Sequence, residues 1–217
     1  VADTDEKLIW KILSEETVLT TPIMTLRSQQ CRAPEGREQK FYILRTRDWC
    51  NVIPINEDGK IVLVRQYRQG SGKVSLEIPG GVADPEDKDL EAAAVREMEE
   101  ETGYTLMPGA RRQYLGWTYS NPAILDNRVH SFIAGPVRRS KTQHLDSGEL
   151  IDVVELPLSE VAEAIRDGRI NHALIVNAFF KLLSKSFDKT LHGPSSCITK
   201  CTNRISFYLV GNIDQHI

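Results

Sequence analysis

The chain has 217 residues with a formal net charge of -3, and 41% of its residues are hydrophobic. This composition is typical of a folded globular protein and excludes wholesale disorder. The near balance of 27 basic and 30 acidic side chains gives no overall attraction to nucleic acid or an anionic membrane, and no apolar run approaches the roughly 20 residues that span a bilayer.

Residues 1–48 predict a small β-rich domain. Residues 17–28 and 39–47 are rich in Thr, Val, Ile, Tyr and Leu, and Pro34 and Gly36 predict a turn between them. These strands are so polar that their own core is thin. We therefore expect this domain to pack against a partner surface, such as a second copy of the chain.

Residues 49–187 predict a mixed α/β domain. The sequence indicates strands over 52–55, 61–64, 74–78, 113–119, 128–134 and 149–156. It indicates helices over 89–102, 159–168 and 171–183. The first helix has the clearest ends, because Asp89 can cap its start and Gly103 lies just past its end. This order of elements favours a largely mixed sheet covered by helices.

The tail, residues 188–217, matches no strong pattern. Cys197 and Cys201, with His192 and His216 nearby, do not have the spacing of a zinc site. A surface strand or a disordered end is the better interpretation.

Three glutamates lie on one face of the first predicted helix. Glu97, Glu100 and Glu101 are separated by three and four positions, so their carboxylates repel one another. A solvated acidic face is the simplest interpretation of the cluster alone. However, Gly80 and Gly81 follow a strand and precede the helix, so their backbone can approach a ligand and offer carbonyl oxygens. Together these features favour a site for a hard divalent cation such as Mg²⁺ or Mn²⁺.

This segment resembles the Nudix box, G-x5-E-x7-R-E-U-x-E-E-x-G-U, where U is a bulky apolar residue. Residues 96–104 match every specified position of its second half. The first half departs, since Gly81 and Arg96 are one residue too far apart. Counting back from Arg96 places the first glutamate position of the box on Lys88, and two acidic residues come just before Lys88. An insertion of one residue in the loop 83–88 explains the extra spacing. In the family that glutamate mainly supports the loop, so the departure concerns loop geometry more than the metal site.

The flanking segments are similar to those of ADP-ribose pyrophosphatases and nucleoside diphosphate sugar hydrolases within the Nudix superfamily. The similar segments are residues 64–68, 76–81 and 120–126. The resemblance runs from about residue 48 to residue 185 and implies an α/β/α sandwich with a mixed sheet. In these enzymes a small N-terminal β-rich domain is swapped in a homodimer. The implied reaction is hydrolysis of a nucleoside diphosphate sugar to a nucleoside monophosphate and a sugar phosphate.

The resemblance also implies roles for residues of the box. Glu97, Glu100 and Glu101 would hold Mg²⁺ or Mn²⁺ together with the carbonyl of Gly80. Arg96 would pair with a box glutamate and fix its orientation, a role that overlaps with that of an ordinary helix-surface arginine.

Other candidate residues lie outside the box. Glu149 is the expected general base or extra metal ligand, with Asp146 the second choice; either is otherwise a plain loop acid.

Substrate contacts are expected from residues on and beside the predicted strands. Arg65 and Arg68 are candidates to contact phosphate, although one of them could instead lie at a solvent-exposed strand edge. Glu77 would hydrogen-bond the substrate or brace the loop. Trp49 or Trp10 would stack on the base, although each is more often simply a core residue.

The same residues also fit three alternative functions. They are a catalytically silent Nudix sensor of nucleotides, a Nudix enzyme for dinucleoside polyphosphates or oxidised nucleotides, and an interaction domain with an acidic helix. The acidic residues 1–6 are unlike a signal peptide, and four cysteines are too few for a disulfide scaffold, so we expect a cytoplasmic protein. The expected partner is a small nucleoside diphosphate sugar, not nucleic acid or a membrane.

Overall fold

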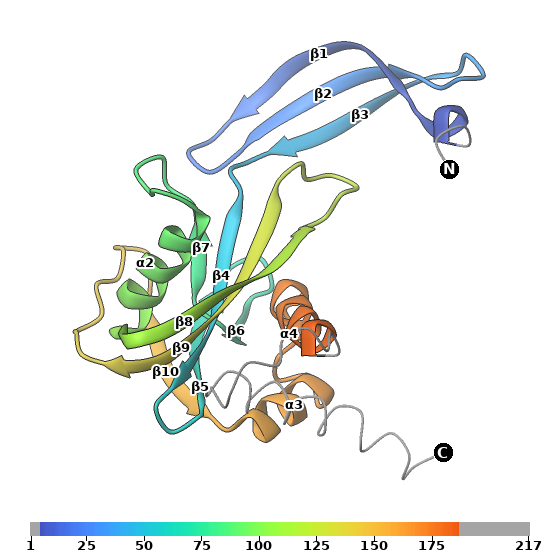
Figure 1. The fold of residues 1–217 in the computed structure, drawn as a ribbon. Coiled ribbons are helices and arrows are strands. Elements are labelled where there is room, and N and C mark those ends of the chain that lie inside the picture. The colour runs from blue at the N-terminus through green and yellow to red at the C-terminus, as the bar shows by residue number, and fades with distance from the viewer. Residues whose placement is uncertain (1–4, 187–217) are drawn as a thin grey trace. The chain divides into compact units, whose positions relative to one another are not determined.

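The N-terminal strands form a sheet of their own in the computed structural model, which describes residues 5–186 (Figure 1). A short 3-10 turn, η1 (Glu6–Leu8), precedes β1 (Lys11–Thr20), β2 (Thr25–Arg32) and β3 (Glu38–Arg45). The three strands are antiparallel in the order β1-β2-β3. Most side chains of β1 are exposed, as the thin predicted core suggests.

The prediction of one strand over residues 17–28 is wrong. A tight turn divides this segment, in which the N–H of Thr21 donates to the carbonyl of Met24 and the N–H of Met24 donates to Thr21 Oγ1. Pro22 lies inside this turn and is the signal that marks it. The predicted turn at Pro34 and Gly36 is confirmed, with Gly36 at a φ of 96°.

A second sheet begins at residue 49. Its strands are β4 (Trp49–Asn56), β5 (Ile61–Arg68), β6 (Lys73–Glu77), β7 (Gly80–Val82), β8 (Tyr104–Tyr119), β9 (Arg128–Arg139) and β10 (Ile151–Leu156). The order is β10-β5-β4-β9-β8, with β6 paired to β5 and β7 paired to β4. Because β4 and β9 are parallel while β4 and β5 are antiparallel, the sheet is mixed, as predicted.

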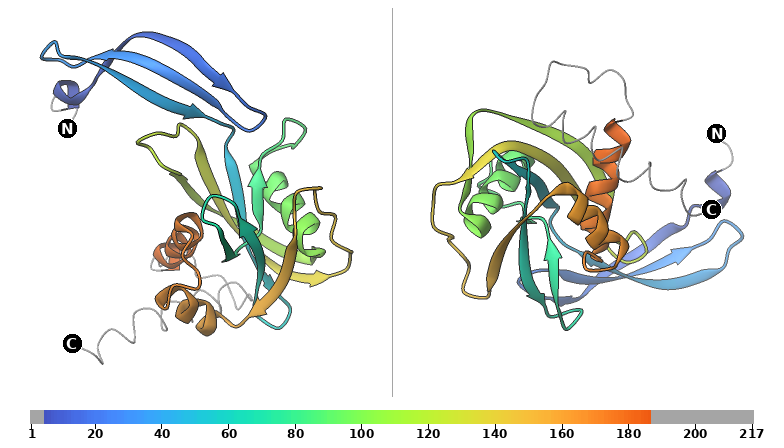
Figure 2. Two further views of the ribbon diagram at one scale, coloured as in Figure 1. Left: turned by 180° about the vertical axis from the view of Figure 1, so that it is seen from behind. Right: turned by 90° about the horizontal axis from the view of Figure 1, so that it is seen from below.

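Helices cover both faces of this sheet (Figures 1 and 2). They are α2 (Leu90–Thr102), α3 (Leu158–Arg166) and α4 (Ala173–Ser186), with α2 on one face and the other two on the opposite face. Alternate residues of β4 supply the two cores: Val52 packs in the cluster that contains Met98 of α2, and Ile53 packs in the cluster that contains Phe179 of α4. The predicted three-layer α/β/α arrangement is confirmed.

The chain divides into two compact units. Among the described residues, the first contains 5–48 with Thr118–Arg128, and the second contains Trp49–Trp117 with 129–186. Division into functional domains at residues 48 and 187 stays a prediction. The predictions made for the tail after residue 187 lie outside the described residues. Within residues 5–186, no helix is long and apolar enough to cross a membrane.

The ends of α2 are fixed by local sequence, as predicted. The Asp89 side chain accepts a 2.8 Å hydrogen bond from the N–H of Ala92. At the other end, Gly103 adopts a left-handed φ of 71° and its N–H donates to the carbonyl of Glu99. Its carbonyl accepts from the N–H groups of Ser140 and Lys141, so this turn also anchors the segment that leads to the late loop.

Replacement of Gly103 tests this anchor. A Cβ there would lie 2.3 Å from the carbonyl oxygen of Lys141, whereas a Cβ at Gly168, which has a similar φ of 82°, meets no atom within 4 Å. We expect Gly168→Ala to cost about 1 kcal/mol from backbone strain, and Gly103→Ala to cost roughly 2 to 3 kcal/mol because the carbonyl must also move. Urea unfolding of both variants measures the difference, and equal losses would contradict the close contact.

Candidate active site

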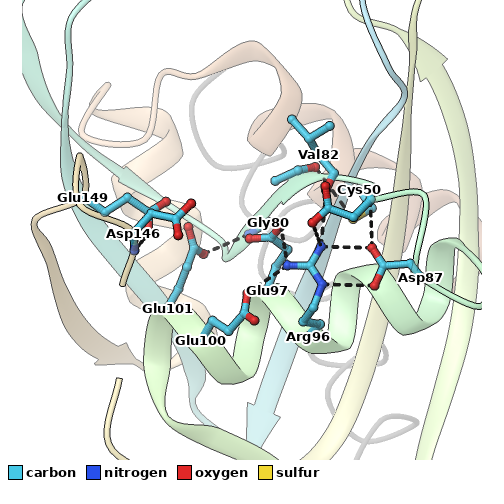
Figure 3. A network of polar contacts seen from close by, with 12 residues as sticks. Cys50, Gly80, Val82, Asp87, Arg96, Glu97, Glu100, Glu101, Asp146 and Glu149 are labelled. Carbon is cyan, nitrogen blue, oxygen red and sulfur yellow. Dashed lines mark hydrogen bonds and ion pairs between the residues drawn. The ribbon is translucent and has the colours of Figure 1, made fainter. Parts of the chain in front are cut away.

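Glu97 and Glu101 of α2 lie against the glycine pair of β7, with Gly80 and the three box glutamates labelled in Figure 3. The three glutamates are unequally buried. Glu101 is only 3% exposed, and the Glu97 side chain is 15% exposed, whereas the Glu100 side chain is 38% exposed. The acidic face of the helix is therefore not a solvated surface. Two of its carboxylates are turned into the protein.

Gly80 and Gly81 make this burial possible. A Cβ on Gly81 would lie 2.7 Å from the carboxyl group of Glu97, and one on Gly80 would lie 2.3 Å from the carbonyl oxygen of Cys50. A side chain at Gly80 would therefore push the loop off β4, and one at Gly81 would displace the Glu97 carboxylate. The close approach lets the N–H of Gly80 donate a 3.0 Å hydrogen bond to Glu101. The predicted role of the Gly80 carbonyl as a metal ligand stays a prediction.

Arg96 ties the helix to the loop that precedes it. Its Nη1 lies 3.0 Å from Glu97 Oε1 and 2.8 Å from Glu100 Oε2. Its Nε and Nη2 donate to the two carboxylate oxygens of Asp87 at 3.0 and 2.9 Å, and Nη2 also contacts the carbonyl of Val82. One guanidinium thus orients two box glutamates and fixes the loop.

Asp87 is a site residue that counting back from Arg96 missed. Its hydrogen bonds from Arg96 hold the pKa of its carboxyl below the usual value. Counted forward from Gly81, Asp87 stands at the first acidic position of the box pattern. The structure therefore places an aspartate where the box has its first glutamate, and the extra residue follows Asp87 instead of lying before it.

The buried carboxylates have raised pKa values. Burial is the largest cause for both, and it raises the pKa of Glu101 to about 8 and that of Glu97 to about 7. The hydrogen bond from Gly80 and the charge of Arg96 act in the opposite direction, and the negative charge of Glu149 adds to the increase. Burial therefore disfavours the ionised form of both carboxylates near neutral pH.

Glu149 lies in the late loop on the same side as the box glutamates (Figure 3). Its carboxylate accepts a 3.1 Å hydrogen bond from the N–H of Asp146, which orders the turn between the two acids. Glu149 is half-buried and Asp146 is exposed. The structure therefore brings both candidate bases toward Glu101, and the choice of Glu149 stays a prediction.

The residues of this site suit a hard divalent cation. Glu97, Glu100 and Glu101 offer carboxylate oxygens. A cation among them would favour the ionised forms of Glu97 and Glu101 and so offset the burial, and the lesser repulsion, that raise their pKa values. In the described part of the chain, no three His, Cys, Asp or Glu side chains are already gathered as ligands. The fit therefore rests on the donor type and the charge.

Comparison with known proteins agrees with this geometry. The sequence model of the NUDIX domain matches residues 45–179, which is more than half of the chain. The chain belongs to the Nudix family. Its residues 10–44 match the nucleoside diphosphate sugar hydrolase N-terminal domain.

Individual relatives share about a quarter to a third of their aligned residues with this chain. The chain is 31% identical over 164 residues to the methanol dehydrogenase activator of Bacillus methanolicus. This alignment covers 74% of this chain and 85% of the relative. It is 26% identical over 164 residues to the ADP-ribose pyrophosphatase of Bacillus subtilis, covering 75% and 86%. The crystal structure of an ADP compounds hydrolase aligns with a TM-score of 0.71 at 24% identity, covering 81% of this chain and 93% of that one. This last likeness shows the shared fold.

Arg68 and Glu77 form a fork-to-fork pair beside the Nudix glutamates. Arg68 Nε and Nη2 donate to the two oxygens of Glu77 at 2.9 and 2.6 Å. Burial alone would raise the pKa of Glu77, but the hydrogen bonds from Arg68 and a contact from His172 outweigh it and lower the pKa to about 2. Glu77 is therefore an ionised, buried brace for Arg68.

The remaining sequence candidates make other contacts. Arg65 is 54% exposed and reaches Asp152, which is its cross-strand neighbour on β10, so its phosphate role stays a prediction. Trp49 is half-buried at the start of β4, and its stacking role also stays a prediction. Trp10 packs edge-on against Phe41 in the N-terminal sheet, with Arg37 over its ring.

The raised pKa of Glu101 predicts a pH-dependent effect on stability. Because the folded-state pKa is about 8 against an ordinary 4.5, the protonated form favours folding, and this stabilisation is lost as the pH rises through 8. Without metal, Glu101→Gln should raise the melting temperature by several degrees at about pH 9 and change it little at about pH 4.5.

Melting curves in a chelator measure this effect, and Glu99→Gln is the control. Glu99 lies on the same helix but pairs with Lys141. Its replacement should give no gain that grows with pH. An equal effect of Glu101→Gln at both pH values would contradict the raised pKa.

Proposed function

We propose that this Nudix protein is a metal-dependent hydrolase that cleaves the diphosphate of ADP-ribose or another nucleoside diphosphate sugar. The observation that carries the proposal is the pair of buried carboxylates, Glu97 and Glu101, against the Gly80–Gly81 backbone. The name of the Bacillus subtilis relative supports ADP-ribose as a substrate. The match of residues 10–44 to the N-terminal domain of nucleoside diphosphate sugar hydrolases supports the wider substrate class.

The mechanism needs charge neutralisation and a proton acceptor. A divalent ion held by Glu97, Glu100 and Glu101 would neutralise the diphosphate and polarise a phosphoryl group. Arg68 would bind a phosphate oxygen with the guanidinium hydrogens that Glu77 leaves over. Arg96 keeps two of the box glutamates oriented throughout.

Glu149 would take the proton from the attacking water. A bond forms between the water oxygen and one phosphorus while the bridging oxygen leaves with the other phosphate. The products are a nucleoside monophosphate and a sugar phosphate. The water oxygen is then in one product, the bridging oxygen is in the other, and the proton is on Glu149.

Activity assays test the proposal directly. With Mg²⁺ and ADP-ribose, the protein should yield AMP and ribose phosphate, identified by mass analysis. Glu100→Gln and Glu149→Gln should each lose activity by on the order of 100-fold, because one removes a metal ligand and the other the base. Glu99→Gln, at the unspecified position of the box, should retain it.

Different failures of this assay have different meanings. The absence of product from a panel of nucleoside diphosphate sugars, with folded protein and metal, would overturn the enzyme proposal. Near-normal turnover by Glu149→Gln would show that another residue is the base.

We also propose that the protein is a homodimer formed through its N-terminal sheet. Side chains such as Ile12, Val18, Leu19 and Ile23 are more than half exposed there. Apolar surface of this extent on a three-stranded sheet favours burial against a partner. A second copy of the chain carries the same exposed apolar side chains and can bury them in a symmetric interface.

Light scattering of the purified protein tests the dimer. The wild-type protein should have twice the mass of one chain, and Val18→Lys should shift it toward the monomer because a charge would enter the interface. Val74→Lys is the matched control, since Val74 is a strand residue of the second sheet with 60% exposure against 51% for Val18. A monomeric wild-type protein would exclude the proposal.

A further inference from the structure

The buried carboxylate of Glu77 joins three elements of the second unit. Glu77 ends β6, Arg68 ends β5, and His172 directly precedes α4. Oε1 of Glu77 accepts from Arg68 Nε, while Oε2 lies 2.6 Å from Arg68 Nη2 and 3.2 Å from His172 Nδ1. Glu77 is 1% exposed, so solvent does not compete for these contacts.

Arg68 is held with one edge of its guanidinium against Glu77, and its side chain is partly exposed. Its side chain is 41% exposed, and the pair with Glu77 uses Nε and Nη2, which leaves the Nη1 hydrogens for a ligand. The hydrogen bonds to Glu77 are the main cause of its raised pKa, and the charges of Glu101 and Glu149 add to it. Arg68 therefore lies within the field of the same carboxylates that form the candidate metal site.

His172 is anchored by the helix that follows it. Its carbonyl accepts from the N–H groups of Ile175 and Val176 at 3.0 and 3.1 Å. Ile175 and Phe179 of α4 are both 3% exposed in the core. The backbone of His172 is therefore fixed, and its side chain contacts Glu77 from outside the strand pair that carries Arg68 and Glu77.

The contact between His172 and Glu77 is close but not ideally aligned. Nδ1 of His172 is buried and makes no hydrogen bond of good geometry in the described part of the chain, although Glu77 Oε2 is 3.2 Å away. The separation is within hydrogen-bond distance. Without His172, Arg68 would be the one side-chain donor to Glu77 among residues 5–186. The pair could then move together, so the direction of the guanidinium would be less defined.

We propose that His172 is a positioning residue for diphosphate binding, which acts through Glu77 to hold the guanidinium of Arg68 toward the carboxylate site. This role rests on the proposed diphosphate hydrolase function. His172 contacts Glu77 and not the reacting groups, so its effect falls on substrate binding. The sequence alone gave His172 no role, because it lies outside the Nudix box.

Kinetics with ADP-ribose test the proposal. His172→Ala should raise KM about 10-fold and change kcat less than about twofold, since the interaction of Arg68 with phosphate is formed on binding. His172→Asn should restore a near-normal KM, because its amide N–H can replace Nδ1–H. Arg68→Ala should raise KM by at least as much as His172→Ala, and the double variant should be no worse than Arg68→Ala alone.

Two kinetic outcomes would overturn the proposal. If the KM effects of His172→Ala and Arg68→Ala multiply in the double variant, the two residues act independently. If His172→Ala lowers kcat and leaves KM unchanged, His172 acts on the chemical step and not on positioning.

Nuclear magnetic resonance separates this proposal from the function on which it rests. In protein labelled with ¹⁵N-arginine, the Nε–H signal of Arg68, assigned with Arg68→Lys, should be slow to exchange. It should exchange several-fold faster in His172→Ala and return to slow exchange in His172→Asn. An unchanged signal in His172→Ala would refute the linkage. A wild-type protein without hydrolase activity would refute the proposed function, and with it the role in diphosphate binding, whatever the signal shows.

Discussion

The burial of like charges on one helix face is the constraint on which this structure depends. Glu97 and Glu101 are held against the backbone of Gly80 and Gly81, and their pKa values rise to about 7 and about 8 as a result. A fold gains nothing from such an arrangement by itself, because the ionised carboxylates oppose both burial and one another. A divalent cation reverses this balance. This balance is what the proposed metal binding would explain.

Two arginine–carboxylate pairs hold the groups around this charge. Arg96 links Asp87 of the loop to the box glutamates, and Arg68 is braced by Glu77. Each pair uses the planar fork of the guanidinium, which fixes direction as well as charge. As a result, the box glutamates and the guanidinium of Arg68 are both oriented before any ligand binds.

Local features could be predicted from the sequence, and long-range pairings could not. The helix Leu90–Thr102 was predictable because Asp89 and Gly103 act on their near neighbours. The role of Asp87 was hidden by the extra residue before Arg96, which only the folded loop resolves. The partners of Arg65 and Arg68 depend on which face of β5 each side chain takes. His172 reaches Glu77 because α4 packs on the sheet, which no local pattern encodes.

The release of protons on metal binding tests the central claim most directly. Calorimetric titration of Mn²⁺ into the protein at about pH 7.5, in buffers of different ionisation enthalpy, measures the protons released. Because Glu97 and Glu101 are partly protonated at this pH, binding should release about one proton, and the number should fall when either residue is replaced by Gln. Binding without proton release, or no binding at millimolar metal, would contradict the account.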